Sequence, residues 1–147
     1  MNFKVIPCLV AGGLLLALGC GPDTSHLPAT VPASGVVTLD GKPVDGAQVV
    51  LIPQPPATKG AYAATDASGK FSLRAFEEKD GAIPGDYKVQ VSKTIQVKIP
   101  GVELDGGEAV RFEFGVPEKY TSVATSGLTC KIPEGGTSDI KLELISK

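Results

Sequence analysis

Hydrophobic residues occupy every second position in most segments of the chain from Ser34 to its end. In residues 87–92, for example, Tyr87, Val89 and Val91 alternate with polar side chains. Successive side chains of a β-strand point to opposite faces, whereas an amphipathic helix repeats its apolar positions with a period of 3.6 residues. No window of the chain has a convincing helical spacing. The pattern therefore predicts strands that bury one face.

Short turn sequences separate the strand segments. Two Asp-Gly pairs, at 40–41 and 45–46, supply the positive φ that tight turns require. Turns and alternating runs together predict seven to eight strands. The strand segments are residues 35–39, 47–53, 61–65, 70–74, 87–92, 110–114, 128–132 and 140–144. This count and spacing predict an all-β chain folded as an antiparallel β-sandwich.

The first two strands are expected to lie on either side of the Asp-Gly pair at 40–41. In that arrangement Val37 and Leu39 share a face with Val49 and Leu51 across the strand pair. The second strand is apolar on both sides, which indicates that a neighbouring segment covers its outer face.

Two aromatic residues are expected to point into the core, because they lie on the apolar side of alternating runs. These are Phe71 and Phe112. Residues 95–102 are apolar but are interrupted by Pro100 and Gly101, and the stretch continues to Gly107. We expect this segment to be an extended excursion or an edge hairpin.

The first 20 residues have the pattern of a signal peptide. Lys4 precedes an apolar run over residues 5–18, and Gly19 and Cys20 follow. A helix that crosses the ~30 Å hydrocarbon core of a bilayer needs about 20 residues, so the run is too short for a permanent membrane anchor.

Residues 16–20 resemble the lipobox of bacterial lipoproteins, in which the cysteine is lipidated. The resemblance implies acyl chains, such as palmitate, on Cys20 and a lipid-anchored, extracytoplasmic protein of the cell envelope. Two or more acyl chains anchor a protein stably. The alternative is an ordinary secretory signal in which Cys20 plays no part. Residues 21–33 are rich in proline and predict a flexible tether, so that the folded domain spans 34–147.

Several turn-and-core motifs occur in a fixed order along the domain. They are SGVVTLDGKPVDGA at 34–47, TDASGKF at 65–71, PGDYKV at 84–89, PEKY at 117–120 and SGLT at 126–129. The order and spacing resemble the carboxypeptidase-regulatory-like lipoproteins of planctomycete bacteria. That resemblance implies a transthyretin-like sandwich of seven strands with an Ig-like Greek key, in a family whose members mostly lack an assigned activity. Residues 94–115 resemble the family least.

The composition removes several classes of function. The net charge is −2 and no basic block is present, which argues against nucleic-acid binding. The single histidine, His26, lies in the tether, so the domain lacks the usual base for a catalytic triad and the usual metal ligand. Cys130 has no cysteine partner within the domain. We therefore expect a protein that is not an enzyme, with no cofactor and no disulfide in the domain.

One loop and one tyrosine are the candidate ligand-binding residues. Glu77, Glu78, Asp80 and Asp86 lie close together in the sequence and are candidates for a weak cation or ligand loop. The alternative for them is a solvated acidic loop. Tyr120 is a candidate aromatic contact for a glycan, and its alternative is to close one end of the sandwich with its hydroxyl bonded to the backbone.

Two hypotheses of function follow from these features. In the first, the chain is a non-catalytic, lipid-anchored protein of the cell envelope that acts as a structural or protein-interaction module. In the second, it is an extracytoplasmic module that binds a glycan or Ca²⁺ through the acidic loop and Tyr120. The membrane is the expected partner of the N-terminal lipid, and the protein or glycan partner of the domain is unidentified.

Overall fold

The computed structural model describes residues 23, 25–56, 58–104 and 107–147, and these are almost entirely β-structure. Within these residues, the one helical element is a short 3₁₀ turn, η1 (Glu118–Thr121). This confirms the all-β prediction. The strands are β1 (Ala33–Leu39), β2 (Lys42–Pro43), β3 (Gln48–Gln54), β4 (Ala61–Ala64), β5 (Lys70–Ser72), β6 (Arg74–Phe76), β7 (Lys79–Asp80), β8 (Gly85–Ser92), β9 (Thr94–Leu104), β10 (Gly107–Phe114), β11 (Leu128–Ile132) and β12 (Thr137–Leu144).

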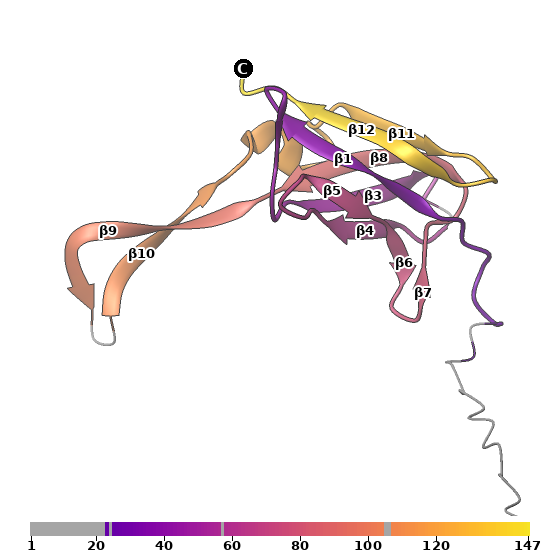
Figure 1. Cartoon of the computed structure of the whole chain (residues 1–147), viewed down its shortest axis with the longest axis horizontal. Helices are drawn as coiled ribbons and strands as arrows, with labels where there is room; N and C mark the ends of the chain where they lie inside the picture. Colours follow the sequence, from indigo (N-terminus) through magenta and orange to yellow (C-terminus); the bar gives the residue numbers. More distant parts are fainter. Residues whose placement is uncertain (1–22, 24, 57, 105–106) are drawn as a thin grey trace, which may run out of the picture.

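Two sheets pack face to face as a β-sandwich, as the alternating pattern predicts (Figure 1). One sheet has the order β11-β8-β3-β4-β6-β7, and the other contains β12-β1-β2 with β5 also paired to β1. The pair β1–β12 is parallel, whereas the other pairs of named strands are antiparallel. The first and last strands of the described domain therefore lie side by side.

The segment from β5 to β6 passes from one sheet to the other. β5 pairs with β1, and β6 pairs with β4 after the single residue Leu73. Leu73 is buried, so the crossing point is fixed by the core. This crossing joins the two layers at one side of the sandwich.

The core lies between the two sheets and consists of the inward-facing residues of most strands. Val37 of β1 faces this core from one sheet, while Val49 and Leu51 of β3 face it from the other. The expected pairing of residues 35–39 with 47–53 is therefore wrong. The buried apolar residues of the core include Val37, Val49, Leu51, Phe71, Leu73, Tyr87, Val89, Val91, Ile132, Ile140, Leu142 and Leu144.

The turn after β1 explains this difference. Asp40 and Gly41 have φ values of 49° and 80°, as an Asp-Gly turn requires. The turn leads into the short strand β2, which pairs with β1. Only after β2 does the chain cross to the opposite sheet. The turn chemistry was predicted correctly, but the partner strand was not.

Strands β9 and β10 form a two-stranded arm that projects from one end of the sandwich (Figure 1). Within the described residues, the two strands pair only with each other. This confirms the expected excursion as a hairpin. Phe112 is 64% exposed, so its predicted inward orientation is wrong. In the part of the chain that the structure describes, no second sheet lies over the arm, and the apolar side of β10 is exposed.

The end of the predicted tether is attached to the sandwich. Val31 and Ala82 exchange two backbone hydrogen bonds of 2.9 and 3.0 Å, and Lys79 Nζ donates to the Pro28 carbonyl at 3.0 Å. Pro32 accepts a bond of 2.9 Å from the Thr137 amide. Contacts with the domain thus begin before Ser34. The predicted signal peptide and Cys20 lie outside the described residues.

Candidate functional site

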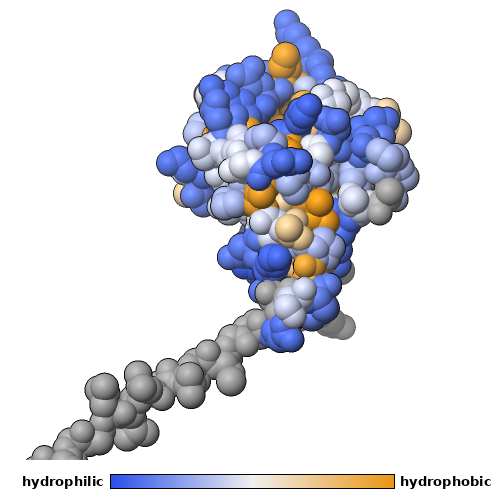
Figure 2. Space-filling model, turned by 90° about the vertical axis from the view of Figure 1, so that its right-hand side faces the viewer, coloured by the Kyte–Doolittle hydropathy of each residue, from blue (hydrophilic) through white to orange (hydrophobic). Residues whose placement is uncertain are grey.

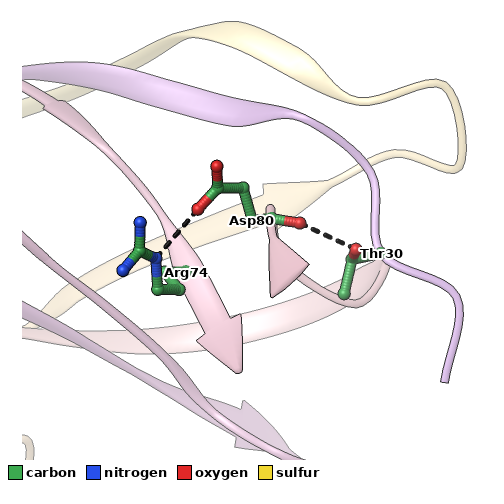
Figure 3. A network of polar contacts seen from close by, with 3 residues as sticks. All are labelled: Thr30, Arg74 and Asp80. Atoms are coloured by element: carbon green, nitrogen blue, oxygen red, sulfur yellow. Dashed lines mark hydrogen bonds and ion pairs between the residues drawn. The ribbon is translucent and has the colours of Figure 1, made fainter. Parts of the chain in front are cut away.

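The predicted acidic loop is divided between a turn and two strands. Glu77 and Glu78 lie exposed in the turn between β6 and β7, and Asp80 belongs to β7. Asp80 Oδ1 accepts a hydrogen bond of 2.8 Å from Arg74 Nε. Thr30 Oγ1 donates to the backbone carbonyl of Asp80 at 2.8 Å (Figure 3). Asp80 is thus the point at which the N-terminal segment, β6 and β7 meet.

Asp86 lies elsewhere, on β8, opposite Lys131 of β11. The described part of the chain contains no group of three or more His, Cys, Asp or Glu residues placed to hold a metal ion. The structure therefore does not assemble Asp86 and the acidic turn into one cation site. Asp86 and the acidic turn are close in the sequence but do not come together in the structure.

Tyr120 closes one end of the sandwich. It lies in η1, its ring is only 5% exposed, and its hydroxyl accepts a hydrogen bond of 3.0 Å from the Ile145 amide. The aliphatic stem of Lys119 brings its ammonium to 4.9 Å from the ring centroid. This confirms the packed alternative and leaves no exposed face with which Tyr120 could stack on a glycan.

Cys130 is a half-buried free thiol on β11. Burial, assisted by the negative charge of Asp86, raises the pKa of the Cys130 thiol to about 11. Its neighbour in register, Tyr87, donates a hydrogen bond of 2.6 Å to the Ile83 carbonyl, and burial raises the pKa of that phenol as well. A thiol that holds its proton so firmly is a poor nucleophile at neutral pH.

The arm carries the largest group of exposed hydrophobic side chains. Val110, Phe112 and Phe114 alternate along β10 and occupy one face of the hairpin, and we call these three residues the arm surface. They are 43%, 64% and 58% exposed. Their register partners on β9 are polar. By contrast, the end of the molecule opposite the arm is mainly hydrophilic, with a narrow hydrophobic strip (Figure 2).

Two ion pairs join charged side chains within the arm. Arg111 Nε lies 2.7 Å from Glu113 Oε1, and Lys98 pairs with Glu108 across the two strands. The Arg111–Glu113 pair lies on the opposite face of β10 from the arm surface, because alternate residues of a strand point to opposite sides. Sequence reasoning missed this surface because its alternation is the same as that of a buried strand. The Pro100-Gly101 interruption was the available signal that the neighbouring strand leaves the sandwich.

A second surface that the sequence did not reveal surrounds Tyr62 on β4. Its side chain is 44% exposed, while its neighbours Ala61 and Ala63 point inward and are buried. Because small apolar residues flank Tyr62 on both sides, the sequence does not indicate which face of the strand is buried. The ring lies beside the Arg74–Asp80 ion pair in a hollow of the surface.

The fold and these surfaces define a small β-sandwich with a projecting hairpin. Residues 33–134 match the model of a family described as a domain of unknown function, DUF6795, and the chain belongs to this family. The match includes the whole arm. No curated protein matches the chain.

Among solved structures, one similarity is to the crystal structure of a 9R-lipoxygenase from Cyanothece PCC8801. The identity is 14% and the TM-score is 0.34, over 79% of this chain but only 16% of the lipoxygenase chain. At that TM-score the likeness carries no argument about fold or function.

Among the residues that the structure describes, no helix has the length and hydrophobicity needed to cross a membrane.

Proposed function

We propose that the chain is a non-catalytic protein of the cell envelope, held at a membrane by lipid on Cys20, and that its arm binds another protein. The observation that carries this proposal is the arm surface, where two phenylalanines are more than half exposed. Large exposed apolar groups that lie together mark interaction sites on soluble domains. A protein partner that covers these rings removes apolar area from water on both sides.

The architecture of the arm also favours a partner. A two-stranded hairpin is marginally stable in water unless a further layer covers one of its faces. The arm receives no such layer from its own sandwich. Its outer strand edges also keep unpaired backbone groups, to which an additional strand can bind. A partner can therefore supply both a covering face and a neighbouring strand.

The arm lies far from the place where a membrane anchor would attach. The N-terminal segment meets the sandwich at Asp80 and Ala82, at the end opposite the arm (Figure 1). Residues 94–114 contain four acidic and two basic side chains, and an acidic hairpin is repelled by an anionic lipid surface. A protein is therefore a better occupant of the arm surface than the lipid bilayer.

The lack of a histidine in the domain favours a binding role over catalysis. Residues 33–147 contain no histidine, and their one cysteine has a raised pKa. The turn-and-core motifs that resemble carboxypeptidase-regulatory-like, transthyretin-like domains are consistent with a module that offers surfaces. A crosslinker placed at a single position of the domain can test for binding even though the partner is unidentified.

A photo-crosslinking amino acid at Phe112 tests the arm. In envelopes of the producing cell we expect a discrete protein adduct, whose mass distinguishes a second copy from a different protein. Ile145 is the matched control because it is also an exposed large hydrophobic residue, at 57%, but lies outside the arm. Phe114→Ser should weaken the Phe112 adduct by about tenfold, as expected for a hot-spot aromatic. Equal labelling from Phe112 and Ile145, or no adduct at Phe112, contradicts the proposal.

Metabolic labelling tests the membrane anchor separately. Cells that express the wild-type chain are given a labelled fatty acid, and incorporation is compared with that of Cys20→Ala. We expect label in the wild type and none in the variant, because the acyl chains need the Cys20 sulfur and the amino group freed beside it. Equal incorporation in both contradicts lipidation at Cys20 and leaves the arm proposal intact.

A further inference from the structure

An elongated groove lies where the segment from β5 to β6 passes between the sheets. Its first hollow has a volume of about 530 Å³ and includes Gln48, Tyr62 and Arg74 in its lining. The second, of about 620 Å³, extends toward Lys70 and Asp139. Both volumes are in the range of about 300 to 1,000 Å³ that is typical of small-ligand sites. The two hollows share the lining residues Ser34, Ala64 and Ser72. We call the combined feature the Tyr62 groove.

Tyr62 provides the groove with an apolar, flat contact. It is the exposed tyrosine of the three in the chain, since Tyr87 and Tyr120 are 2% and 5% exposed. Its register neighbours on the same sheet are Val50 and Arg74. Ala64, the next residue on its face of β4, is too small to cover the ring. An aromatic ring left open in this way can stack on the apolar face of a ligand.

The polar groups of the groove are arranged around this ring. The Arg74–Asp80 pair uses only Nε and Oδ1, and the Asp80 backbone is held by Thr30 (Figure 3). The Nη groups of Arg74 and Oδ2 of Asp80 take no part in this bond, and the side chains of Gln48 and Ser72 line the same hollow. The pair is well exposed, so it contributes little to stability. The Arg74–Asp80 pair presents hydrogen-bond donors and acceptors to the groove.

The charges of the groove are nearly balanced. Arg74 is neutralised by Asp80, and Asp139 lies 3.4 Å from Lys141. Asp66 is occupied within its own turn, where Oδ1 accepts bonds from the Ser68 and Lys70 amides. The groove offers a strongly charged ligand no cluster of charges of one sign, because its lining holds Arg74 and Lys70 together with Asp66, Asp80 and Asp139. A neutral ligand with many hydroxyl groups finds both donors and acceptors.

We propose that the Tyr62 groove binds a neutral oligosaccharide. A sugar ring has an apolar C–H face that fits the open side of Tyr62 and a rim of hydroxyls that fits the Arg74–Asp80 pair, Gln48 and the two serines. The length of the groove, over two adjoining hollows, accommodates several linked rings. This site lies on the sandwich and does not depend on the arm.

Fluorine NMR of the full-length chain, labelled with 3-fluorotyrosine and held in detergent micelles, tests the proposal. The chain has three tyrosines and no tryptophan, so three resonances are expected, and Tyr62→Phe assigns the one from the groove. The probes are cellohexaose, laminarihexaose and mannohexaose at millimolar concentration. We expect at least one hexasaccharide to shift the Tyr62 resonance saturably, while those of Tyr87 and Tyr120 stay fixed. Glucose or mannose alone should shift it less at equal concentration.

Calorimetric titration with the same hexasaccharide separates ring stacking from other effects. Tyr62→Ala should weaken binding by about tenfold, whereas Tyr62→Phe, which keeps the ring, should retain most of it. Phe112→Ser is the matched control outside the groove and should leave binding unchanged, so failure here is distinguishable from failure of the arm proposal. The proposal is overturned if no hexasaccharide shifts the Tyr62 resonance, if all three resonances shift together, or if only an unstructured peptide of similar length shifts it.

Discussion

At the residue scale, two tyrosine hydroxyls each attach one element to a neighbouring segment by a single hydrogen bond. The hydroxyl of Tyr120 joins η1 to the segment after β12 through the Ile145 amide, and the hydroxyl of Tyr87 joins β8 to the turn before it. Both rings are buried, so neither hydroxyl can exchange its partner for water at no cost. These bonds fix the ends of the sandwich.

Removal of the Tyr120 hydroxyl should therefore destabilise the fold. For Tyr120→Phe we expect the free energy of unfolding in urea to fall by about 1 kcal/mol, because the Ile145 amide loses its partner while the ring stays packed. Tyr62→Phe is the matched control, since its ring is exposed, and it should change stability by less than about 0.5 kcal/mol. Equal effects of the two substitutions would contradict the role given to Tyr120.

The raised pKa of Cys130 predicts slow alkylation and a definite pH dependence. At pH 9 an unperturbed thiol with the ordinary value of 9.0 is half ionised, whereas a thiol with a pKa of about 11 is only about 1% ionised. Iodoacetamide should modify Cys130 about fifty times more slowly in the folded protein than in urea, measured on its tryptic peptide by mass spectrometry.

The sign of the stability effect follows from the same shift. The folded state holds the Cys130 proton more firmly than the unfolded chain does. Its contribution to stability is complete below pH 9 and is lost as the pH rises toward about 11. Cys130→Ser should remove this loss between pH 9 and 11. A wild-type and a variant profile that fall in parallel over that range would argue against burial of the thiol.

At the scale of elements, the parallel pair β1–β12 has a close backbone approach at Gly35. A Cβ on Gly35 of β1 would lie 2.1 Å from the Ile140 carbonyl oxygen of β12. Real Cβ atoms do not approach backbone that closely, so the two strands can lie at this separation only because residue 35 is glycine. The pairing of β1 with β12 thus depends on a glycine at position 35.

Gly35→Ala should accordingly force β1 and β12 apart. We expect a loss of about 3 kcal/mol or more of unfolding free energy, since backbone and not a mobile side chain blocks the new methyl group. Gly135→Ala is the matched control, because nothing lies within 4 Å of a Cβ there. Thermal unfolding followed by circular dichroism measures both. A stable Gly35→Ala variant would contradict the close approach.

The elements also show how far the sequence could predict this structure. Alternation identified the strands and most inward-facing residues, such as Phe71 and Ile140, because the period of a strand is local. It did not identify strand partners, because pairing depends on where the chain goes after each turn. Phe112 has the same pattern as Val89, yet only Val89 has a sheet above it. Alternating hydrophobic residues show that the two faces of a strand differ. They do not show that another layer covers the apolar face.

The candidate sites were harder to predict for a related reason. Glu77 and Asp86 are close in sequence, but a strand and a change of direction separate their side chains. The Tyr62 groove, conversely, brings together Ser34, Ala64 and Ser72 from three strands. Contacts of this kind arise from the crossing between the sheets, which no local pattern encodes.

At the scale of the whole molecule, the described structure divides into a sandwich and an arm whose two strands pair only with each other. The arm begins after Lys93 and ends before Gly115, and at its base the Gly115 amide donates to the Lys93 carbonyl at 2.7 Å. The chain therefore leaves the sandwich at Lys93 and re-enters it at the neighbouring residue Gly115.

Excision of the arm should leave the sandwich folded. Replacement of residues 94–114 by Asn-Gly, which suits a tight turn between Lys93 and Gly115, should change unfolding free energy by less than about 1 kcal/mol. Truncation of β12, residues 137–147, is the contrasting variant and should abolish cooperative thermal unfolding, because it exposes β1 and part of the core. An unfolded arm-less variant would show that the hairpin stabilises the domain after all.

The direction of β1 determines how the molecule responds to tension. β1 enters at Ala33, beside the N-terminal segment, and runs to Leu39, which shares a surface hollow with Lys93 and Gly115 at the base of the arm (Figure 1). A pull between the N-terminus and the arm therefore acts along β1. It loads the backbone hydrogen bonds to β12 and β5 in shear, so that many must rupture at once instead of unzipping one after another. We therefore expect the pairing of β1 with β12 and β5 to resist tension along the line that joins the N-terminal segment to the arm.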